Sequence, residues 1–478
     1  MSGETITERE VPSEGAEREG ELVTDGLTEG HGEPLGNHEH LAVRDEDSAP
    51  AGDKTTAITV SPATAPRAEA EAGVGPRVLL LGAGEFGREL AVALQGFGAE
   101  VIAADGYPDA PAHRVADQSL VVTLTDGDEL GAVLARLRPD FVVTLTDAVN
   151  GAALDAFDSS QARDSDSGAG FTELVPNARS VRLLGDREGL RKLAADELGL
   201  PTAPFWFVGS LGELEAVAAH AGYPLLVRPA TKADGRRHSV VRERAGINEA
   251  WERATAGGAA GAQPRVWAEM VVDVEFLITL IVVCTEAANG PVIEFCAPIG
   301  HRVADGGQLE AWQPQKMSAA AFDAAKSIAA RIVKALGGRG VFGVELMING
   351  DEVYFADVTA WPGDTSWVTR RTQRLSVFEL QARAILGVAV DTLMVSPGAA
   401  WVIGPGRASA SGAPGAHAFQ ALTAALSVPE SDVRVFGRAG AGAPGKRAVA
   451  LATAPDVAIA RDRAREVAAR LDMPDSRG

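Results

Sequence analysis

The sequence predicts an α/β protein built from several domains, and three observations lead to this prediction. Order begins at Arg77, where the buried-strand run RVLLL leads through a glycine-rich turn into a helix and a second strand. Strand and helix patterns then alternate to about residue 390, as in layered α/β architectures. With 478 residues, 46% of them hydrophobic, the chain can form more than one core.

Residues 1–75 are predicted to form a disordered acidic tail. The segment consists mainly of Glu, Gly, Ala, Ser, Thr and Pro and has no sustained hydrophobic periodicity. Such a composition cannot bury enough apolar surface to offset the entropy lost on ordering. Fourteen acidic and three basic residues in the first 50 positions account for about half of the formal net charge of −21. The overall acidity argues against nucleic-acid binding, because phosphate backbones are held by clustered Lys and Arg.

The apolar segments indicate a protein without a membrane span. No apolar run approaches the roughly 20 residues that cross a bilayer, and acidic and polar residues follow Met1 in place of an export signal. We therefore expect a cytoplasmic protein that binds small molecules. Cys284 and Cys296 lie in strand-like apolar stretches, so we expect two buried thiols in preference to a disulfide or a metal site.

The first strand–turn–helix carries the pattern GxGxxG at Gly82, Gly84 and Gly87. This pattern lets a backbone approach phosphate at a helix N-terminus, and Asp105 at the end of the second strand fits a dinucleotide site. Glu85 inside the turn favours another ligand, because its carboxylate would repel a pyrophosphate. The segment predicts an amine-bearing substrate, with nicotinamide binding as the less favoured alternative.

The middle of the chain predicts two further units. We expect an exposed loop over residues 158–170, a helical segment over 180–200 that stops at Pro201, and then strands at FWFV, PLLVRP, HSVVR, RVWAEMVV and EFLITLIVV. Helices are expected at LGELEAVAAHA, NEAWERATA and AAFDAAKSIAARIVKALG. The last portion, from Met394, combines short strands and Gly-rich turns with a final helix.

Two acids on neighbouring strands form a candidate metal site. Glu345 and Asp357 lie on strands joined by a tight turn at Asn349-Gly350-Asp351, and strand alternation should bring both carboxylates to one face. Mg²⁺ bridging nucleotide phosphates would relieve the repulsion between them. A solvent-facing acidic pair is the alternative.

Two other positions suit a nucleotide. Arg228 ends the strand PLLVRP beside a Gly-containing loop and is a candidate phosphate ligand, although a simple salt bridge is the alternative. Glu269, where a strand becomes a linker, is placed to hydrogen-bond an adenine.

Several segments in one order resemble a known family. GAGEFGREL, DREGLRKLAADELGLPT, CAPIGHR, AWQPQKM, GGRGVFGVEL and the late FGR...GKRAVALATA resemble the formate-dependent phosphoribosylglycinamide formyltransferases of the ATP-grasp superfamily, from about Arg77 to Asp472. The resemblance implies an α/β ATP-grasp fold, with an N-terminal parallel-sheet (pre-ATP-grasp) domain over residues 76–178. An ATP-grasp domain over 179–393 and a small β-rich C-terminal domain over 394–478 would follow.

In that family ATP phosphorylates formate to formyl phosphate, which the amine of phosphoribosylglycinamide attacks. The resemblance implies ATP and Mg²⁺ as cofactors, formate and a phosphorylated amine as partners, and a homodimer. The implied catalytic residues are Arg228 and Asp364, and the implied metal ligands are Glu345 and Asp357. The implied ATP-binding residues are Arg187, Arg228, Gly235, Glu269, Val272 and Glu275. The implied substrate-binding residues are Glu85, Phe86, Asp364, Arg438, Lys446 and Arg447.

This chain departs from the family pattern in its pockets. Leu145 and Leu277 stand where the family has acids, Asp357 replaces a Glu, and Trp361 replaces an arginine. The phosphate loop, TKADGRR at 231–237, has an added acid and one glycine fewer. We therefore expect an ATP- and Mg²⁺-dependent ligase or formyltransferase. The alternative is a weak or inactive homologue that binds nucleotide or sugar phosphate in a regulatory or complex-forming role.

Overall fold

The structure is a computed structural model. It describes residues 75–164, 171–230, 237–256, 263–287, 290–304, 307–404, 416–436 and 448–472. The predicted tail, residues 1–75, lies outside these ranges except for its last residue. All the described residues belong to one compact unit of the chain.

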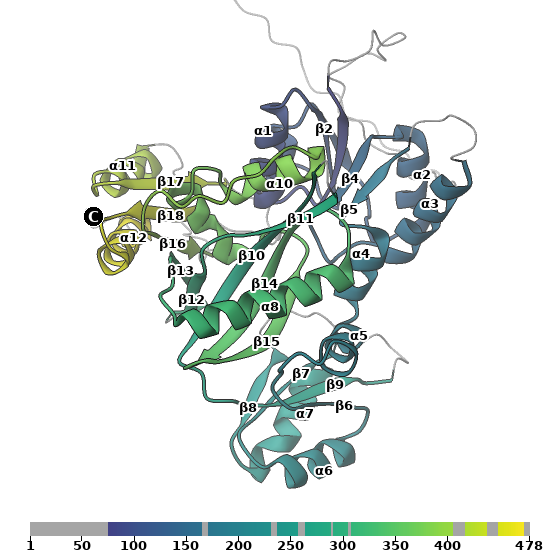
Figure 1. The fold of residues 1–478 in the computed structure, drawn as a ribbon, viewed down its shortest axis with the longest axis vertical. Coiled ribbons are helices and arrows are strands. Elements are labelled where there is room, and N and C mark those ends of the chain that lie inside the picture. The colour runs from purple at the N-terminus through teal and green to yellow at the C-terminus, as the bar shows by residue number, and fades with distance from the viewer. Residues whose placement is uncertain are drawn as a thin grey trace, which may run out of the picture. The chain divides into compact units, whose positions relative to one another are not determined.

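A five-stranded parallel sheet begins the described chain (Figure 1). Its strand order is β3-β2-β1-β4-β5, and every neighbouring pair is parallel. The strands are β1 Arg77–Leu81, β2 Glu100–Asp105, β3 Gln118–Val121, β4 Phe141–Thr144 and β5 Glu173–Val175. The helices between them are α1 Glu85–Gln95, the 3₁₀ turn η1 Pro111–Arg114, α2 Gly127–Leu137 and α3 Gly151–Asp164.

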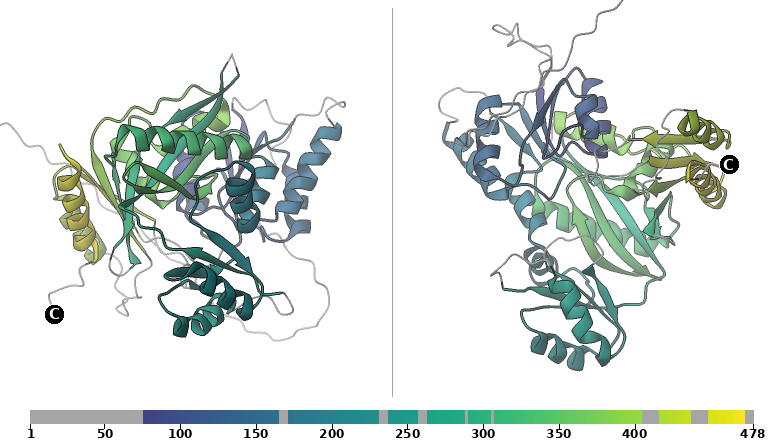
Figure 2. Two further views of the ribbon diagram at one scale, coloured as in Figure 1. Left: turned by 60° about the horizontal axis from the view of Figure 1, so that its bottom comes forward. Right: turned by 180° about the vertical axis from the view of Figure 1, so that it is seen from behind.

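Helices cover both faces of this sheet, which explains why residues 78–81 of the central strand β1 are all apolar and buried. Leu79, Leu81 and Ile102 pack against α2 and α3 on one face. Val78 and Leu80 pack on the other face against α1 and against α10, Val377–Leu386. Seen from behind, the sheet lies between these helices (Figure 2).

One prediction for the following segments was wrong in detail, and the structure refines another. The expected exposed loop over 158–170 begins with helix, because α3 continues to Asp164. The predicted helical segment over 180–200 is helical, and it is divided into α4 Ala178–Gly185, α5 Arg187–Lys192 and the π-helical turn η3 Leu193–Glu197. The division falls at Asp186, whose side chain accepts a hydrogen bond from the backbone N–H of Gly189 and so begins a new helix.

A four-stranded antiparallel sheet follows, with the order β6-β9-β7-β8. Its strands are β6 Phe205–Val208, β7 Leu225–Pro229, β8 Ser239–Val241 and β9 Val266–Met270. The accompanying helices are α6 Leu211–Ala221, η5 Arg244–Gly246 and α7 Ile247–Thr255. Buried residues of α6 and α7 pack on the sheet in one apolar cluster, so these helices close its core.

A nine-stranded sheet carries the rest of the described chain. Its order is β15-β14-β10-β12-β13-β16-β18-β17, with β11 paired to the far half of β10. The strands are β10 Phe276–Ala287, β11 Gly290–Phe295, β12 Ile299–Val303, β13 Leu309–Gln313, β14 Gly340–Asn349, β15 Glu352–Thr359, β16 Gly398–Ile403, β17 Ser431–Val435 and β18 Ala448–Thr453. The C-terminal strands therefore extend the same sheet.

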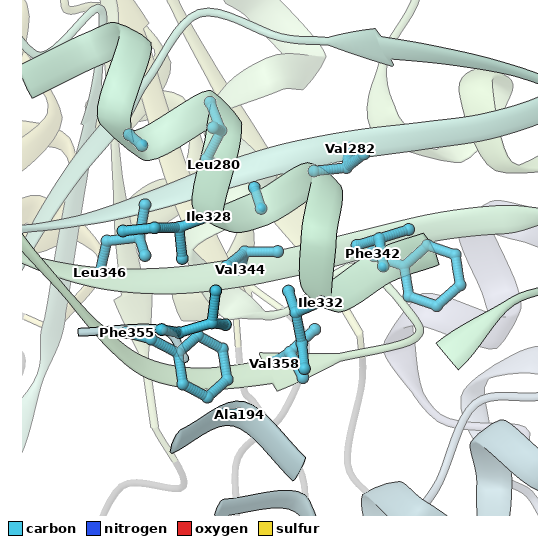
Figure 3. Close-up of a cluster of buried hydrophobic side chains, with 14 of the residues drawn as sticks. Ala194, Leu280, Val282, Ile328, Ile332, Phe342, Val344, Leu346, Phe355 and Val358 are labelled. Carbon is cyan, nitrogen blue, oxygen red and sulfur yellow. The ribbon is translucent and has the colours of Figure 1, made fainter. Parts of the chain in front are cut away.

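One face of this sheet is closed by α8, Ala319–Leu336. Figure 3 shows Ile328 and Ile332 of α8 among Leu280, Val344 and Phe355 of the sheet. These side chains are no more than 3% exposed. The face of β14 and β10 toward α8 is thereby occupied. On the opposite face, Ile281, Val283 and Val341 pack in a second apolar cluster with η7, Asp364–Val368, and α10, and the polar pair Thr279 and Glu345 lies further along the same two strands.

The remaining helices are η7 Asp364–Val368, α9 Thr369–Thr372, α10, α11 Ala416–Leu426 and α12 Val457–Asp472. Cys284 and Cys296 are buried and unpaired, as predicted, and burial raises the pKa of both thiols to about 12. In the part of the chain that the structure describes, no helix is both long and apolar enough to cross a membrane.

Candidate active site

The glycine turn after β1 is held by backbone contacts that account for its sequence. Gly82 has φ of +106°, and a Cβ on Gly87 would come within 2.6 Å of the Gly82 carbonyl oxygen. The Asp105 carboxylate accepts hydrogen bonds from the N–H groups of Ala83, at 2.7 Å, and Gly106, at 2.8 Å. Asp105 thus has a structural role in holding the glycine turn, which accounts for an acid at this position without a nicotinamide cofactor.

The predicted substrate residues Glu85 and Phe86 begin α1. Glu85 is buried in the first turn of the helix, where its charge suits the helix dipole. The Phe86 ring packs 4.9 Å from the Trp367 ring in η7. Asp364, half-buried at the start of η7, lies three residues before Trp367. The structure therefore brings the segments of Glu85, Phe86 and Asp364 together.

An arginine pocket occupies the predicted nucleotide-phosphate position. Arg228, on β7, donates from Nη2 to Oε2 of Glu269 on β9 at 2.9 Å, and its guanidinium carbon lies 3.6 Å from the Trp267 ring centre. The Nε atoms of Arg187 and Arg228 are buried and have no hydrogen-bond partner among the described residues. Burial lowers the pKa of Arg228, and the negative charge of Glu269 opposes this effect. Two guanidinium groups with unused buried donors fit anionic phosphate oxygens.

Sequence reasoning missed Arg191, which belongs to the same cluster. Its side chain is 2% exposed and donates to Oε1 of Glu269 at 2.8 Å and to the carbonyl oxygen of Phe355 at 2.9 Å. The predicted adenine-binding acid, Glu269, thus already accepts from two arginines. The signal was a basic residue within the apolar pattern of DREGLRKL.

The predicted metal ligands Glu345 and Asp357 are direct neighbours across β14 and β15. If the register of the hairpin, which pairs Asn349 with Glu352 next to the turn, continued without interruption, Ala356 would lie opposite Glu345. A register shift after Glu345 brings Asp357 there instead. Since Phe355 and Val358 both face the α8 core, the bulge lets Asp357 turn away from that core.

This acid pair suits Mg²⁺ in its chemistry. Two carboxylates supply hard oxygen ligands, and Mg²⁺ takes its other ligands from water and phosphates. No group of three or more His, Cys, Asp and Glu side chains that could hold a metal occurs among the residues that the structure places. The pair therefore fits a metal held jointly with a phosphorylated ligand.

A chain of hydroxyls and an imidazole runs beside Glu345. Thr279 on β10 is the cross-strand neighbour of Glu345, and its Oγ1 accepts from Thr365 at 2.9 Å and lies 3.4 Å from Nδ1 of His301. Burial lowers the pKa of His301 to about 4, so the imidazole is neutral at pH 7. These three side chains, His301, Thr279 and Thr365, connect β12 and β10 to η7, the element that begins with Asp364.

The other predicted nucleotide residues lie along the linker between β9 and β10. Val272 is half-buried and Glu275 is exposed just before β10. Leu277, at a position where the family has an acid, is 38% exposed, and it pairs with Met347 and His301. Strand alternation places Leu277 on the same face as Thr279.

Four predicted residues lie outside the described ranges: Gly235, Arg438, Lys446 and Arg447. The structure does describe the segment that ends at Phe436, two residues before Arg438. Arg88 of α1 donates to the carbonyl oxygen of Val435 at 2.9 Å and lies 5.9 Å from the Phe436 ring centre. The helix that begins with Glu85 therefore contacts the chain immediately before Arg438.

Two departures from the family pattern pack against apolar clusters. Leu145, directly after β4, packs against the core between the parallel sheet and α1. Trp361 packs against the α8 core and also lines a cavity of about 200 Å³ with Thr146, Asp147 and Arg182. The cavity thus joins the end of β4 to the segment that follows β15.

A parallel sheet followed by two antiparallel sheets, with an arginine pocket and an acid pair, defines an ATP-grasp protein. An ATP-grasp domain profile matches residues 193–378. The formate-dependent phosphoribosylglycinamide formyltransferase of Rhodococcus jostii is 44% identical over 397 residues, which cover 83% of this chain and 95% of that protein. The enzyme of the same name from Burkholderia pseudomallei is 44% identical over 395 residues, covering 82% and 94%. The chain belongs to the formate-dependent phosphoribosylglycinamide formyltransferase family.

Solved structures agree with this assignment. A structure described as glycinamide-RNase-transformylase T from Mycobacterium tuberculosis is 64% identical, with a TM-score of 0.69, and the match covers 83% of this chain and all of that one. An ADP complex of an N5-carboxyaminoimidazole ribonucleotide synthetase has the same TM-score at 19% identity and shares the fold. The predicted ATP-grasp fold and family are confirmed.

Proposed function

We propose that this protein formylates phosphoribosylglycinamide with formate, at the expense of ATP. The observation that carries the proposal is the pair of buried Nε atoms of Arg187 and Arg228, which have no hydrogen-bond partner among the described residues, in a chain that belongs to this family. Arg228 interacts electrostatically with Asp357, the neighbour of Glu345, so the phosphate-binding and metal-binding positions lie close together.

The proposed reaction has two bond exchanges. A formate oxygen takes the terminal phosphoryl group of ATP, and ADP leaves. The substrate amine then attacks the formyl carbon, the carbon–oxygen bond to phosphate breaks, and the nitrogen loses a proton. Arg187 and Arg228 would hold the phosphate oxygens, and Glu345 and Asp357 would hold Mg²⁺, which neutralises developing charge when bound. Val272 and Glu275 remain predictions for the adenosine part, and Gly235 remains one for the phosphates.

The amine substrate is proposed to lie between α1 and η7. Glu85 and Asp364 supply carboxylates there, and the contact of Phe86 with Trp367 holds the two segments together. Arg438, Lys446 and Arg447 remain predicted ligands of the ribose phosphate. We further propose a cytoplasmic homodimer with ordered domains over 76–178, 179–393 and 394–478.

One observation favours a second candidate, a weak or inactive homologue that binds nucleotide. Leu277 is exposed on the same sheet face as Thr279, where an acid is expected to hold the nucleotide ribose. A leucine offers no hydrogen bond, so the chain would bind ATP less tightly there. Losing such a partner costs on the order of 1 to 3 kcal/mol.

The test is ADP release by the purified protein with Mg·ATP and formate, with and without phosphoribosylglycinamide. Amine-dependent turnover that Glu345→Ala abolishes is the expected result. Glu352→Ala is the matched control, because Glu352 lies exposed on the same hairpin and bonds the Tyr354 hydroxyl. ATP binding without ADP release under any of these conditions would instead favour the inactive homologue. Release with formate alone would indicate a different amine.

A further inference from the structure

The nucleotide site contains a buried cation that the reaction itself does not require. Arg191 of α5 is 2% exposed, and its guanidinium carbon lies 4.7 Å from the Trp267 ring centre and 5.8 Å from that of Phe355. A charge so deeply buried is costly unless each polar atom near it is used. Its placement therefore calls for a specific role.

The side chain of Arg191 joins two sheets. Glu269, its carboxylate partner, belongs to β9 of the four-stranded sheet, and Phe355, its carbonyl partner, belongs to β15 of the nine-stranded sheet. Phe355 stands two residues before Asp357, at the bulge that faces Asp357 toward Glu345. Arg191 therefore fixes the acid beside Arg228 and the strand that carries a predicted metal ligand.

The two oxygens of Glu269 are divided between two arginines. Oε1 accepts from Arg191 at 2.8 Å, and Oε2 accepts from Arg228 at 2.9 Å. Among the residues that the structure describes, Arg191 is the hydrogen-bond donor recorded for Oε1, so its removal would leave that buried oxygen without this partner. Arg228, the other described arginine that bonds Glu269, would then be drawn into a two-pronged pair with it, because bidentate pairing is the preferred geometry of arginine and carboxylate.

We infer that Arg191 is a positioning residue that occupies one oxygen of Glu269 and so keeps Arg228 available for the phosphates of a nucleotide. The inference rests on the nucleotide binding in the proposed function and adds Arg191 as the residue that controls it. Arg191 touches no phosphate in this scheme and acts through Glu269.

A double-mutant cycle read out by ATP binding tests the inference. Arg191→Met should weaken ATP binding at least about tenfold in the wild-type chain. In a Glu269→Gln chain the same change should cost less than about threefold, because the neutral amide no longer captures Arg228. The affinity for adenosine, which lacks phosphates, should fall less than about threefold when Arg191→Met is introduced into either the wild-type or the Glu269→Gln chain. Lys192→Met, an exposed cation on the same helix, is the matched control and should leave ATP binding unchanged.

Several outcomes distinguish this role from general packing. Equal losses of ATP binding in both backgrounds, or an equal loss for adenosine, would overturn the inference and leave the proposed function standing. Absence of ATP binding by the wild-type chain would overturn the proposed function as well. Arg191→Lys, which keeps the charge, should retain most of the affinity. If Arg191→Met does not fold, Arg191→Leu, which also offers no donor to Oε1 of Glu269, replaces it in the cycle.

Discussion

At the residue scale, the bulge in β15 determines the position of the Asp357 carboxylate relative to Glu345. It brings the Asp357 carboxylate opposite Glu345, although an uninterrupted hairpin would place Ala356 there. Asp357→Asn removes a negative oxygen ligand and should lower amine-dependent ADP release by at least about 100-fold, on the order of 3 kcal/mol. Asp357→Glu keeps the charge on a longer arm and should stay within about tenfold. Equal losses for both variants would contradict a metal-ligand role.

His301 should make folding stability depend on pH. Its pKa is lowered to about 4 by burial, while the unfolded chain has the ordinary value near 6.5. The unfolded state therefore takes up the proton first, and stability is lost as the pH falls from about 6.5 towards 4. Between pH 7 and 4.5 the free energy of unfolding of the wild type should fall by about 2 to 3 kcal/mol more than that of His301→Asn.

Urea unfolding at the two pH values measures this difference. His220→Asn, at an exposed histidine in the last turn of α6, is the matched control for the substitution itself. A His301→Asn chain with the wild-type slope would show that the imidazole is not responsible.

The sequence identified the titratable groups of the site better than their connections. Local patterns predict Glu345, Asp357, Arg228 and Glu269, because a carboxylate or a cation within or at the end of an apolar strand is visible in a single segment. Their hydrogen-bond partners were not visible, since Arg191 meets Glu269 across 78 positions of the chain. The bulge at Ala356 was equally hidden, because the turn residues alone predict an uninterrupted hairpin.

At the element scale, the packing of α8 on the nine-stranded sheet should dominate stability. Ile332 is fully buried between α8 and the strands shown in Figure 3. Ile332→Ala should lower the free energy of unfolding by about 2 to 5 kcal/mol through lost burial and a residual cavity. Lys334→Ala, exposed on the same helix, should change it by less than about 0.5 kcal/mol. Chemical denaturation compares the two, and similar values would contradict the assigned core.

Most elements followed from hydrophobic pattern, and the exceptions have local causes. The predicted helix AAFDAAKSIAARIVKALG corresponds to α8, which Ser318 caps at its start. Polar residues misled the prediction at α3, because DSSQARD is hydrophilic but still continues the helix to Asp164. Capping by Asp186 divided the segment 180–200, a side-chain contact that periodicity does not detect.

At the scale of the whole molecule, an ion pair connects the parallel sheet to the nine-stranded sheet. Arg339, just before β14, donates from Nε to Glu173 of β5 at 2.8 Å, and a second bond joins the same side chains. Arg339→Ala should lower stability by about 1 to 3 kcal/mol, because a partly buried charged hydrogen-bonded pair is lost. Glu249→Gln, in an exposed pair on α7, should cost less than about 0.5 kcal/mol.

Loss of the ion pair between Arg339 and Glu173 should also make the parallel sheet and the nine-stranded sheet unfold in separate transitions. Far-UV circular dichroism and tryptophan fluorescence should give coincident transitions for the wild type and displaced ones for Arg339→Ala. Coincident transitions in the variant would show that other contacts are enough to couple the sheets.

The two buried thiols give the chain a practical property for spectroscopy. Cys284 and Cys296 are its only cysteines, and both combine burial with a pKa raised to about 12. At neutral pH almost no thiolate is present, so maleimide dyes should react very slowly with the native protein. Cysteines introduced at exposed positions, such as Ala216→Cys on α6 and Lys334→Cys on α8, would then carry the labels alone. Energy transfer between two such dyes would follow, in solution, any movement of the four-stranded sheet when ATP is added.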